Sequence, residues 1–454
     1  MECGVLDRVK PRTLSGFMEL LPPQQVLFDA MARRLRESFS LYGFTPLDTP
    51  LMEAAEILLA KGGGETDKQI YTLQKSDTDL ALRYELTASL AKYVALNYSH
   101  LAFPFRRYEI GKVYRGERAQ RGRYREFYQA DIDIIGDGSL DILNEAEIPS
   151  VIYKSFMSMG LERFVIRINN RKTLSGFFEI VGVGAATPDV MRVVDKLDKI
   201  GVEKLTDLFT DDLGLSNKQA DEILGFVAYG GDPFEILDKY RGRNAMFDLG
   251  ADELAAVKKH VEGFGVPDSH FKIDLSIARG LDYYTGTVFE TTLTDHPGVG
   301  SVCSGGRYDN LAEYYTDRKM PGVGISIGLT RLFSVLQEQG LLNEQTLTAP
   351  SDVLIIPMTD DLSHAVALAA SMREAGLRVQ IHGEGKKLKS KVYYADKLGI
   401  PFVIFLGEDE INGGTITVKD LASGQQTTAS AGILTAGISE KIATLRSGSP
   451  IRET

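Results

Sequence analysis

The chain has 454 residues, 43% of them hydrophobic, which is enough for ordinary globular cores in about three domains. No apolar run approaches the ~18 residues needed to cross a membrane, and the N-terminus lacks the apolar stretch of a secretory signal, so we expect a cytoplasmic protein. Two cysteines give no disulfide framework or metal-site spacing, and a net charge of −11 argues against general electrostatic binding of nucleic acid.

The first two thirds of the chain alternate between helical and strand patterns. Residues 24–41 have apolar side chains at helical spacing and predict an amphipathic helix. The elements expected next are a strand-like segment at 42–50, a helix at 86–98, an antiparallel hairpin at 108–135, a helix at 144–160 and a strand at 164–170. From 172 to 262, short helical patterns predict a helical insertion that splits the sheet-bearing domain. Strand patterns return over 271–327, and a helix follows from 329.

A linker around 340–350 precedes a region of different character. Strands and helices alternate from 351 onward, which predicts an α/β unit with a mainly parallel sheet. Four lysines near the middle of this region could bind an RNA backbone, although a solvated lysine face is the alternative. They are Lys386, Lys387, Lys389 and Lys391. We expect the tail beyond 446 to be frayed.

The hairpin at 108–135 has polar side chains on one face of each strand. Arg115 and Glu117 are two residues apart, and the same spacing joins Phe127, Gln129, Asp131 and Asp133. Side chains alternate along a strand, so each set shares a face. A guanidinium, carboxylates, an amide and an aromatic ring suit a nucleotide, because they can bind phosphate, an exocyclic amine and a base. An amphipathic hairpin with a solvated, charge-paired face is the alternative.

Further segments carry a family resemblance. They are LRYELTAS at 82–89, IARGLDYYTGTVFE at 277–290, SVCSGGRYDNL at 301–311 and GVGISIGLTRLF at 322–333. Together with YGFTPLDTP at 42–50, they make the chain resemble histidyl-tRNA synthetases, a family of class II aminoacyl-tRNA synthetases, nearly from end to end. The segments ARGLDYYTG and SGGRYDNL are specific to this family and its close paralogues.

The resemblance implies an α+β fold. A catalytic domain over 1–340 would have a six- or seven-stranded antiparallel sheet and the helical insertion at about 172–262, and an α/β anticodon-binding domain would occupy 351–454. A homodimer is also implied, with 42–50 at its symmetric interface. The implied reaction joins histidine and ATP into histidyl-adenylate and then transfers histidine to the 3′ end of tRNA(His).

The resemblance assigns two catalytic cations to the first step. Negative charge builds up on the α-phosphate of ATP, and fixed guanidinium groups aimed at it would lower the barrier. Arg115 is one candidate, and Arg279, at the head of RGLDYYTG, is the other. A structural ion pair at the end of a strand is the alternative for Arg279.

Four side chains are assigned by resemblance to the rest of ATP. Phe127 would stack on adenine and Glu117 would accept its amino group, while Arg123 would bind the distal phosphates. Arg331 would cover the other adenine face or bind the γ-phosphate. A place in the core is the alternative for Phe127, and a helix surface is the alternative for Arg331. Mg²⁺ would accompany ATP, and Thr330 stands where the family commonly has an acidic residue, so the resemblance assigns no residue to the ion.

Six side chains are assigned by resemblance to histidine: Glu85, Thr87, Gln129, Asp133, Tyr283 and Tyr284. The first three would bind the ammonium group, Asp133 and Tyr284 would bind the imidazole nitrogens, and Tyr283 would close the pocket. A helix cap is the alternative for Glu85 and Thr87, and aromatic packing is the alternative for the tyrosines. Such a hydrogen-bonded pocket rejects analogues without the imidazole nitrogens, so no editing site is expected.

A regulatory paralogue is the competing functional interpretation. The histidyl-synthetase-like regulatory subunit of ATP phosphoribosyltransferase shares the catalytic fold but lacks the anticodon domain, and its signature segments are usually degraded. An inactive synthetase-like module attached to a kinase is a second alternative. This chain has the intact ARGLDYYTG segment and a long C-terminal region, which favour the synthetase.

Overall fold

The computed structural model describes residues 9–60, 67–75, 77–118, 122–278, 283–343, 347–446, 448 and 450–451. The chain divides into two compact units. The first contains Ala32–Gly340, and the second contains Leu341–Arg452 together with Leu20–Met31. No helix among the described residues is long and apolar enough to cross a membrane.

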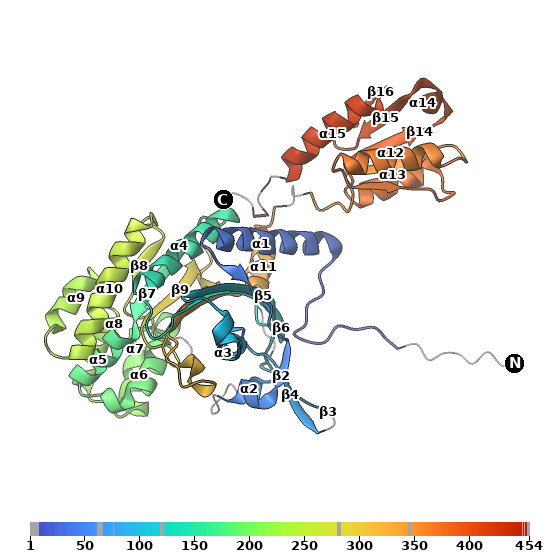
Figure 1. The fold of residues 1–454 in the computed structure, drawn as a ribbon. Coiled ribbons are helices and arrows are strands. Elements are labelled where there is room, and N and C mark those ends of the chain that lie inside the picture. Colours follow the sequence, from blue (N-terminus) through green and yellow to red (C-terminus); the bar gives the residue numbers. More distant parts are fainter. Residues whose placement is uncertain are drawn as a thin grey trace. The chain divides into compact units, whose positions relative to one another are not determined.

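The first unit is built on an eight-stranded sheet (Figure 1). In spatial order its strands are β1 (Thr45–Pro46), β5 (Phe105–Tyr114), β6 (Glu126–Ile135), β11 (Gly322–Ile327), β10 (Ser301–Tyr308), β9 (Thr287–Leu293), β7 (Phe164–Asn170) and β8 (Phe271–Ile273). The six central strands pair antiparallel, as expected. The two edge strands pair parallel with their neighbours, which the sequence did not predict. Long connections precede β5 and β8, and parallel pairing requires such crossovers.

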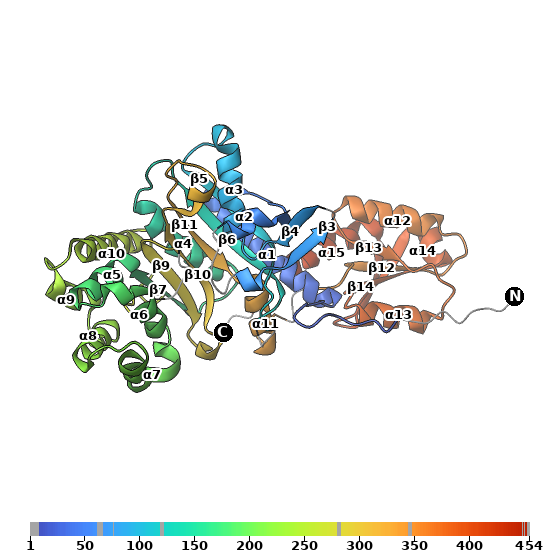
Figure 2. The same cartoon turned by 90° about the horizontal axis from the view of Figure 1, so that it is seen from below.

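Helices pack on the sheet and beside it. On the face away from the pocket described below, α11 (Leu329–Glu338) packs against β6, and α4 (Leu143–Ser158) packs against β11. On the other face lies α3 (Thr87–Asn97), next to α2 (Ala55–Leu59) and a small sheet. That sheet has the order β2 (Met52–Ala54), β4 (Thr78–Leu82), β3 (Thr72–Lys75), and Figure 2 shows it beside α2. The first long helix, α1, spans Pro22–Leu41.

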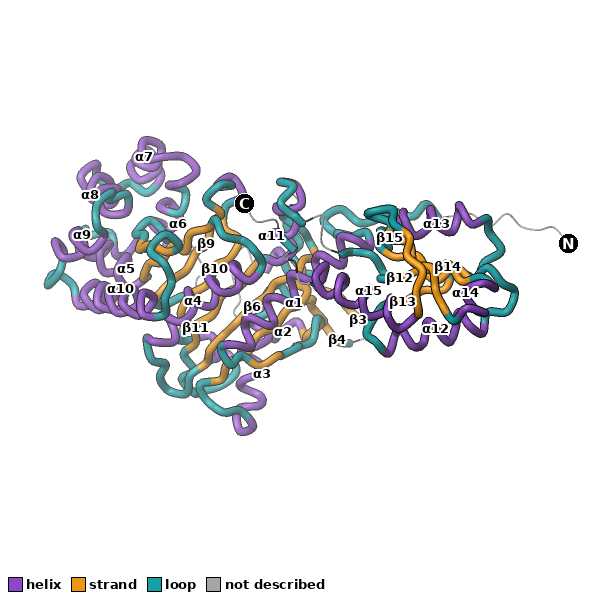
Figure 3. Tube along the Cα trace, turned by 90° about the horizontal axis from the view of Figure 1, so that it is seen from above, coloured by secondary structure: helices purple, strands orange, loops and turns teal. Residues whose placement is uncertain are grey.

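The expected helical insertion forms a separate group of helices at one end of the large sheet (Figure 3). Its elements are α5 (Arg171–Ile180), α6 (Thr187–Val194), α7 (Leu197–Asp207), α8 (Asn217–Val227), α9 (Pro233–Tyr240) and α10 (Ala245–Gly263). The Phe177 and Phe226 rings stack at 3.9 Å between centroids in its core. Glycines let α5 and α10 touch, because a Cβ on Gly250 would lie 2.4 Å from the Thr173 nitrogen.

The second unit contains the predicted α/β domain, but its sheet is mixed. The order is β13 (Val379–Ile381), β12 (Val353–Pro357), β14 (Phe402–Leu406), β15 (Thr415–Asp420) and β16 (Gln426–Ser430). Only the first three strands are parallel. The short α14 (Glu408–Gly413) joins β14 to β15, and this connection is too short for a parallel crossover. The other helices are α12 (Ser363–Glu374), α13 (Leu388–Lys397) and α15 (Ala431–Arg446).

Two sequence predictions for this unit need correction. Lys391 is only 8% exposed and donates a hydrogen bond to the His382 carbonyl at 3.2 Å, so it does not belong to an exposed lysine patch. The tail is not frayed throughout, because the nitrogen of Asn343 donates to the Pro450 carbonyl and Ile451 pairs with Leu342. Both tail residues, Pro450 and Ile451, are buried.

Candidate active site

A pocket of about 440 Å³ lies over the central strands of the large sheet. This volume is in the range of small-molecule binding sites. The pocket is lined by eleven of the twelve side chains to which the sequence assigns a substrate: Glu85, Thr87, Arg115, Glu117, Arg123, Phe127, Gln129, Asp133, Tyr283, Tyr284 and Arg331. The twelfth, Arg279, lies outside the described residues, which resume at Tyr283.

Strand β6 forms one wall of the pocket with the predicted face. Phe127, Gln129, Asp131 and Asp133 all line the cavity. The alternate side chains of β6 point to the opposite face, toward α11. There Thr330, 1% exposed, accepts a hydrogen bond from the backbone nitrogen of Tyr128 at 2.8 Å. This buried contact attaches the helix that carries Arg331 to the strand that carries Phe127.

The outer end of the pocket carries the arginines. The prediction that Arg115 and Glu117 lie on a strand is wrong, because β5 ends at Tyr114 and the chain continues as a loop. Arg115 Nε donates to the Tyr84 carbonyl at 3.1 Å, and its guanidinium carbon lies 5.2 Å from the centre of the Phe127 ring. The loop therefore brings the cation to the aromatic ring without the strand geometry that the spacing suggested.

Two further arginines border this end. Arg123, with a side chain 54% exposed, is 3.4 Å from Glu117 Oε2. Arg331 extends from the first turn of α11 and donates to the Val299 carbonyl. The half-buried or exposed state of these groups leaves them accessible to a large anionic ligand.

The inner end of the pocket is buried and polar. Gln129 is 8% exposed, and its Nε2 donates to Ser326 Oγ at 2.6 Å. Glu85 is 3% exposed and accepts from the Tyr283 hydroxyl at 3.4 Å. Thr87 is the first residue of α3 and is also buried. Glu85 and Thr87, Gln129, Tyr283 and Ser326 come from four separate segments and line the same cavity.

Two tyrosines close the inner end. The rings of Tyr283 and Tyr284 meet edge to face, with centroids 4.9 Å apart. Burial raises the pKa of the Tyr284 hydroxyl, and the nearby carboxylates of Glu85 and Asp133 raise it further. The hydroxyl therefore stays protonated and can donate a hydrogen bond to a ligand at neutral pH.

Asp133 is held by two residues to which the sequence analysis gave no role. Its Oδ1 accepts from the Tyr308 hydroxyl at 2.6 Å, and its Oδ2 lies 2.7 Å from Nη2 of Arg107. Arg107 is completely buried. Burial raises the pKa of the Asp133 carboxyl, and Arg107 opposes that rise. Arg107 lies opposite Asp133 in the hairpin, so its side chain is on the same face of the sheet as Asp133. Strand alternation could have shown this in the sequence, but the assignment of site residues did not include Arg107.

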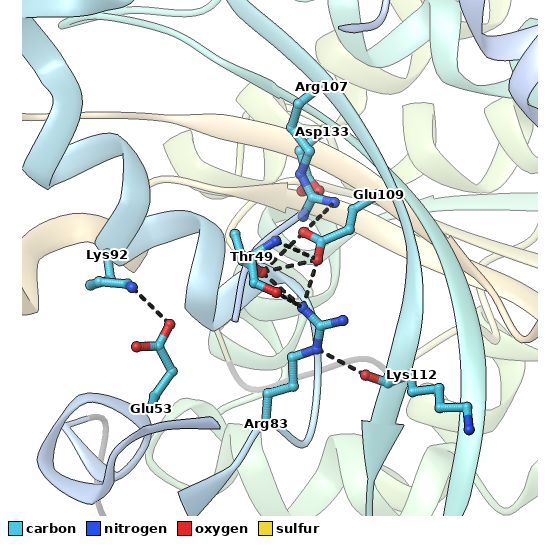
Figure 4. A network of polar contacts seen from close by, with 8 residues as sticks. All are labelled: Thr49, Glu53, Arg83, Lys92, Arg107, Glu109, Lys112 and Asp133. Carbon is cyan, nitrogen blue, oxygen red and sulfur yellow. Dashed lines mark hydrogen bonds and ion pairs between the residues drawn. The ribbon is translucent and has the colours of Figure 1, made fainter. Parts of the chain in front are cut away.

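The buried charges continue from Asp133 toward the 42–50 segment (Figure 4). Arg107 is 3.9 Å from Glu109, which forms a 2.6 Å ion pair with Arg83. The backbone nitrogen and hydroxyl of Thr49 donate to the same Glu109 carboxylate. A buried charge is stable only when it is paired and hydrogen-bonded, so this network fixes the position of the carboxylate in the pocket.

No cluster of three or more His, Cys, Asp or Glu side chains suited to a metal ion occurs among the residues with described positions. Several carboxylates nevertheless line the pocket, among them Glu117 in the loop and Glu290 on β9. Mg²⁺ commonly binds one or two carboxylates together with substrate phosphates and several waters, so the residues present fit an ion that arrives with a phosphate ligand.

The comparisons with known proteins agree with this geometry. The family model described as "Histidyl-tRNA synthetase" matches residues 16–332, and the model "Anticodon binding domain" matches residues 352–441. A histidine–tRNA ligase from Clostridium tetani is 51% identical over 92% of this chain and 96% of its own length. The crystal structure of histidyl-tRNA synthetase from Nostoc sp. superposes with a TM-score of 0.87, at 39% identity, over 96% of this chain and 100% of the other.

A second structural relative bears on the competing interpretation. The structure described as an ATP phosphoribosyltransferase regulatory subunit/histidyl-tRNA synthetase, from Bacillus halodurans, superposes with a TM-score of 0.72 and 21% identity. It covers 88% of this chain and 99% of its own. At that identity the likeness shows a shared fold and nothing about activity.

Proposed function

The chain belongs to the histidyl-tRNA synthetase family, and we propose how its pocket divides the two substrates of histidine activation. The outer end would bind ATP, and the inner end would bind histidine. The observation that carries this proposal is the convergence of half-exposed arginines at one end and buried carboxylates at the other, within a single cavity. The reaction is the attachment of histidine to tRNA, and the regulatory interpretation has no better support.

In the first step, a carboxylate oxygen of histidine forms a bond to the α-phosphorus of ATP, and the bond to the β-phosphate oxygen breaks to release pyrophosphate. Arg115 and Arg279 would stabilise the charge on the α-phosphate. Adenine would stack on Phe127, with Glu117 accepting its amino group. The short distance between Arg115 and the Phe127 ring supports a shared role, because phosphate and base of one nucleotide would meet both.

The remaining outer groups would hold the triphosphate. Arg123 would bind the distal phosphates, and Arg331 would bind the γ-phosphate or cover the exposed face of adenine. Arg331 reaches the pocket from a helix attached to β6 through Thr330, which supports a fixed position for it. Mg²⁺ would neutralise phosphate charge, and Glu290, which lines the pocket from β9, is the carboxylate that could hold it.

At the inner end, histidine would be read by groups that are already buried. Glu85, Thr87 and Gln129 would bind the ammonium group. Asp133 and Tyr284 would bind the two imidazole nitrogens, and Tyr283 would cover the ring. Tyr284 donates and Asp133 accepts, which matches a neutral imidazole with one bare and one protonated nitrogen.

In the second step, a hydroxyl of the terminal ribose of tRNA(His) attacks the carbonyl carbon of the adenylate, and AMP leaves. We propose that residues 351–454 form the domain that binds the anticodon and that 1–340 is the catalytic domain. Lys386, Lys387 and Lys389 are exposed before and within α13, and the same helix carries Tyr394, which is 40% exposed. Lysines for phosphate and a tyrosine for a base suit single-stranded RNA.

The proposed homodimer would form around the 42–50 segment. Leu41, Leu51 and Met52 flank that segment and are 72%, 43% and 43% exposed. Exposed apolar side chains at both ends of this segment favour a protein partner, here a second copy of the chain. We also propose a cytoplasmic location, because translation consumes the product.

Histidine-dependent exchange of labelled pyrophosphate into ATP tests the proposed adenylation. We expect exchange with histidine and none without it, and charging of tRNA(His) when tRNA is added. A protein that binds histidine but supports no exchange would favour the regulatory interpretation. Replacing Lys386 and Lys389 with Glu tests the second unit separately: charging should fall, while exchange should remain at the level of the unmodified protein.

A further inference from the structure

Asp131 lines the pocket but has no role in the division proposed above. It lies between Gln129 and Asp133 on the same face of β6 and is 2% exposed. Its Oδ1 is buried and has no hydrogen-bond partner among the residues that the structure describes. A carboxylate oxygen left in this state is costly, and native proteins usually satisfy such an atom with a partner or a ligand.

The register of the sheet shows what surrounds Asp131. It pairs with Ser326 of β11, which pairs with Ser304 of β10, so a row of small polar side chains crosses the pocket floor. All three residues line the cavity. The row is open enough for a ligand to lie over it and polar enough to receive the charged part of that ligand.

The neighbouring row has a different character. Asp133 pairs with Gly324, which pairs with Gly306, and a Cβ on Gly306 would lie 3.1 Å from the Tyr284 ring. Because neither glycine has a side chain, the Tyr284 ring packs directly on Gly306 and the Asp133 carboxylate lies directly against Gly324. The two groups proposed to bind the imidazole therefore both lie at this row. The two rows are one two-residue repeat of a strand apart, about 7 Å. An amino acid whose ring lies over the glycine row can therefore place its ammonium group over the serine row.

The charges around Asp131 point to a cationic ligand. Arg107 attracts the Asp131 carboxylate, but its guanidinium is already paired with Asp133 at 2.7 Å. Burial raises the pKa of the Asp131 carboxyl to about 8, and the attraction of Arg107 only partly offsets this. A ligand cation beside Oδ1 would supply the missing partner.

We propose that Asp131 binds the α-ammonium group of histidine and is a further specificity-determining residue of the pocket. The inference rests on the proposed binding of histidine at the inner end. It adds a second carboxylate, from the floor of the sheet, to the ammonium site that Glu85 forms from the side of α3.

Titration calorimetry of the full-length protein with three ligands tests this assignment. Histidine and histidinol carry both the imidazole and the ammonium group, whereas imidazolepropionate lacks the ammonium. For Asp131→Asn, the Kd values of histidine and histidinol should rise about tenfold to a hundredfold, the scale of a hydrogen bond to a charged group. The Kd of imidazolepropionate should change less than about twofold, because the imidazole contacts remain.

Asp133→Asn is the matched comparison, since it removes the same charge one repeat along the strand. It should weaken all three ligands, because each contains the imidazole. Equal weakening of all three ligands by Asp131→Asn, or no change in any, would overturn the ammonium assignment. Unchanged ATP affinity and a cooperative melt show that the variant is folded. Failure of Asp133→Asn to weaken any ligand would instead contradict the proposed imidazole site.

Discussion

The two ends of the pocket recognise their ligands in different physical environments. At the outer end, Arg115, Phe127 and Arg331 are half-buried and Arg123 is exposed, so water screens their charges. At the inner end Gln129, Asp131 and Asp133 are at most 8% exposed. Screened groups suit a large anion that brings many contacts, whereas desolvated groups discriminate strongly between small ligands that differ in one hydrogen bond.

The same contrast extends to the supporting contacts. Among the outer arginines, Arg115 and Arg331 donate to the backbone carbonyls of Tyr84 and Val299, and Arg123 lies 3.4 Å from Glu117 Oε2. The inner carboxylate of Asp133 is held by a buried network that includes Arg107 and Tyr308. Substitutions at the inner end should therefore affect stability and specificity together, while those at the outer end should affect ligand binding alone.

Arg107→Met should have the largest effect on stability. It leaves Asp133 and Glu109 buried without their shared cation, and breaking a buried ion pair in this way costs about 3–5 kcal/mol. Urea denaturation at pH 7 measures the free energy of unfolding. Arg123→Met, which removes an exposed arginine from the outer end, is the control and should cost less than about 1 kcal/mol. Equal losses in both variants would show that the two ends do not differ in this way.

Arg279→Ala should have the largest effect on the rate of adenylation. Loss of one fixed donor to the α-phosphate is expected to lower the rate of pyrophosphate exchange about 10²–10³-fold. The melting temperature should stay near that of the unmodified protein. Arg192→Ala, in an exposed ion pair of the helical insertion, serves as the control. Exchange within a few-fold of the unmodified rate would remove Arg279 from the catalytic cations.

The sequence predicted much of this pocket because strand periodicity and family segments point to the same residues. The alternation along 127–133 identified one face of β6 correctly. Alternation also places Arg107 and Glu109 on that face, but it cannot show that a charged side chain is buried. Their partners, Tyr308 and Arg83, are brought together only by the folded sheet and its neighbouring loop.

Other differences between the predicted and the observed elements arose where the pairing of strands depends on the length of the chain that connects them. The spacing of Arg115 and Glu117 fits a strand, yet β5 ends before them because its partner strand begins only at Glu126. The mixed sheet of the second unit follows from the short connection through α14, whose helical pattern in the sequence was too brief to be noticed. In both cases the structure depends on which strands pair in the folded sheet, and a local sequence pattern does not show which strands pair.

Asp133→Asn should weaken histidine binding much more than ATP binding. The imidazole would lose a hydrogen bond to a charged group, worth about 1.5–3 kcal/mol. Because the Arg107 guanidinium would also lose its charged partner, a melting curve must accompany the kinetics. Equal rises in the KM values for histidine and ATP would place Asp133 in a purely structural role.

Phe127→Ala should raise the KM for ATP, because the variant loses a base–aromatic stack worth about 1–3 kcal/mol of binding free energy. The half-buried ring contributes less to the core than a fully buried one, so the melting temperature should fall little. Phe289→Ala, which removes a 2%-exposed ring from β9, is the comparison for a core loss and should be clearly less stable. A large loss of stability with unchanged ATP affinity would make Phe127 a core residue.

Asp131→Asn should produce a smaller effect, a gain in stability of about 1 kcal/mol near pH 8. The pKa of the Asp131 carboxyl is higher in the folded protein than in the unfolded chain, so the folded state is stabilised at low pH, where this carboxyl is protonated. That contribution is lost as the pH rises from about 4 to about 8. The groups around it are Arg107 and Glu109 on β5, Asp133, Cys303 on β10 and Ser326 on β11. The gain should therefore shrink toward pH 5. A gain that does not depend on pH would contradict the titration of Asp131.

The division of the pocket is tested most directly by the double variant that combines Asp133→Asn and Phe127→Ala. The KM values for histidine and ATP would be measured in pyrophosphate exchange on both single variants and on the double variant. Independent ends predict that the histidine KM of the double variant matches Asp133→Asn and that its ATP KM matches Phe127→Ala, within about 0.5 kcal/mol. If either single variant raises both KM values equally, the two ends do not act separately and the account is wrong.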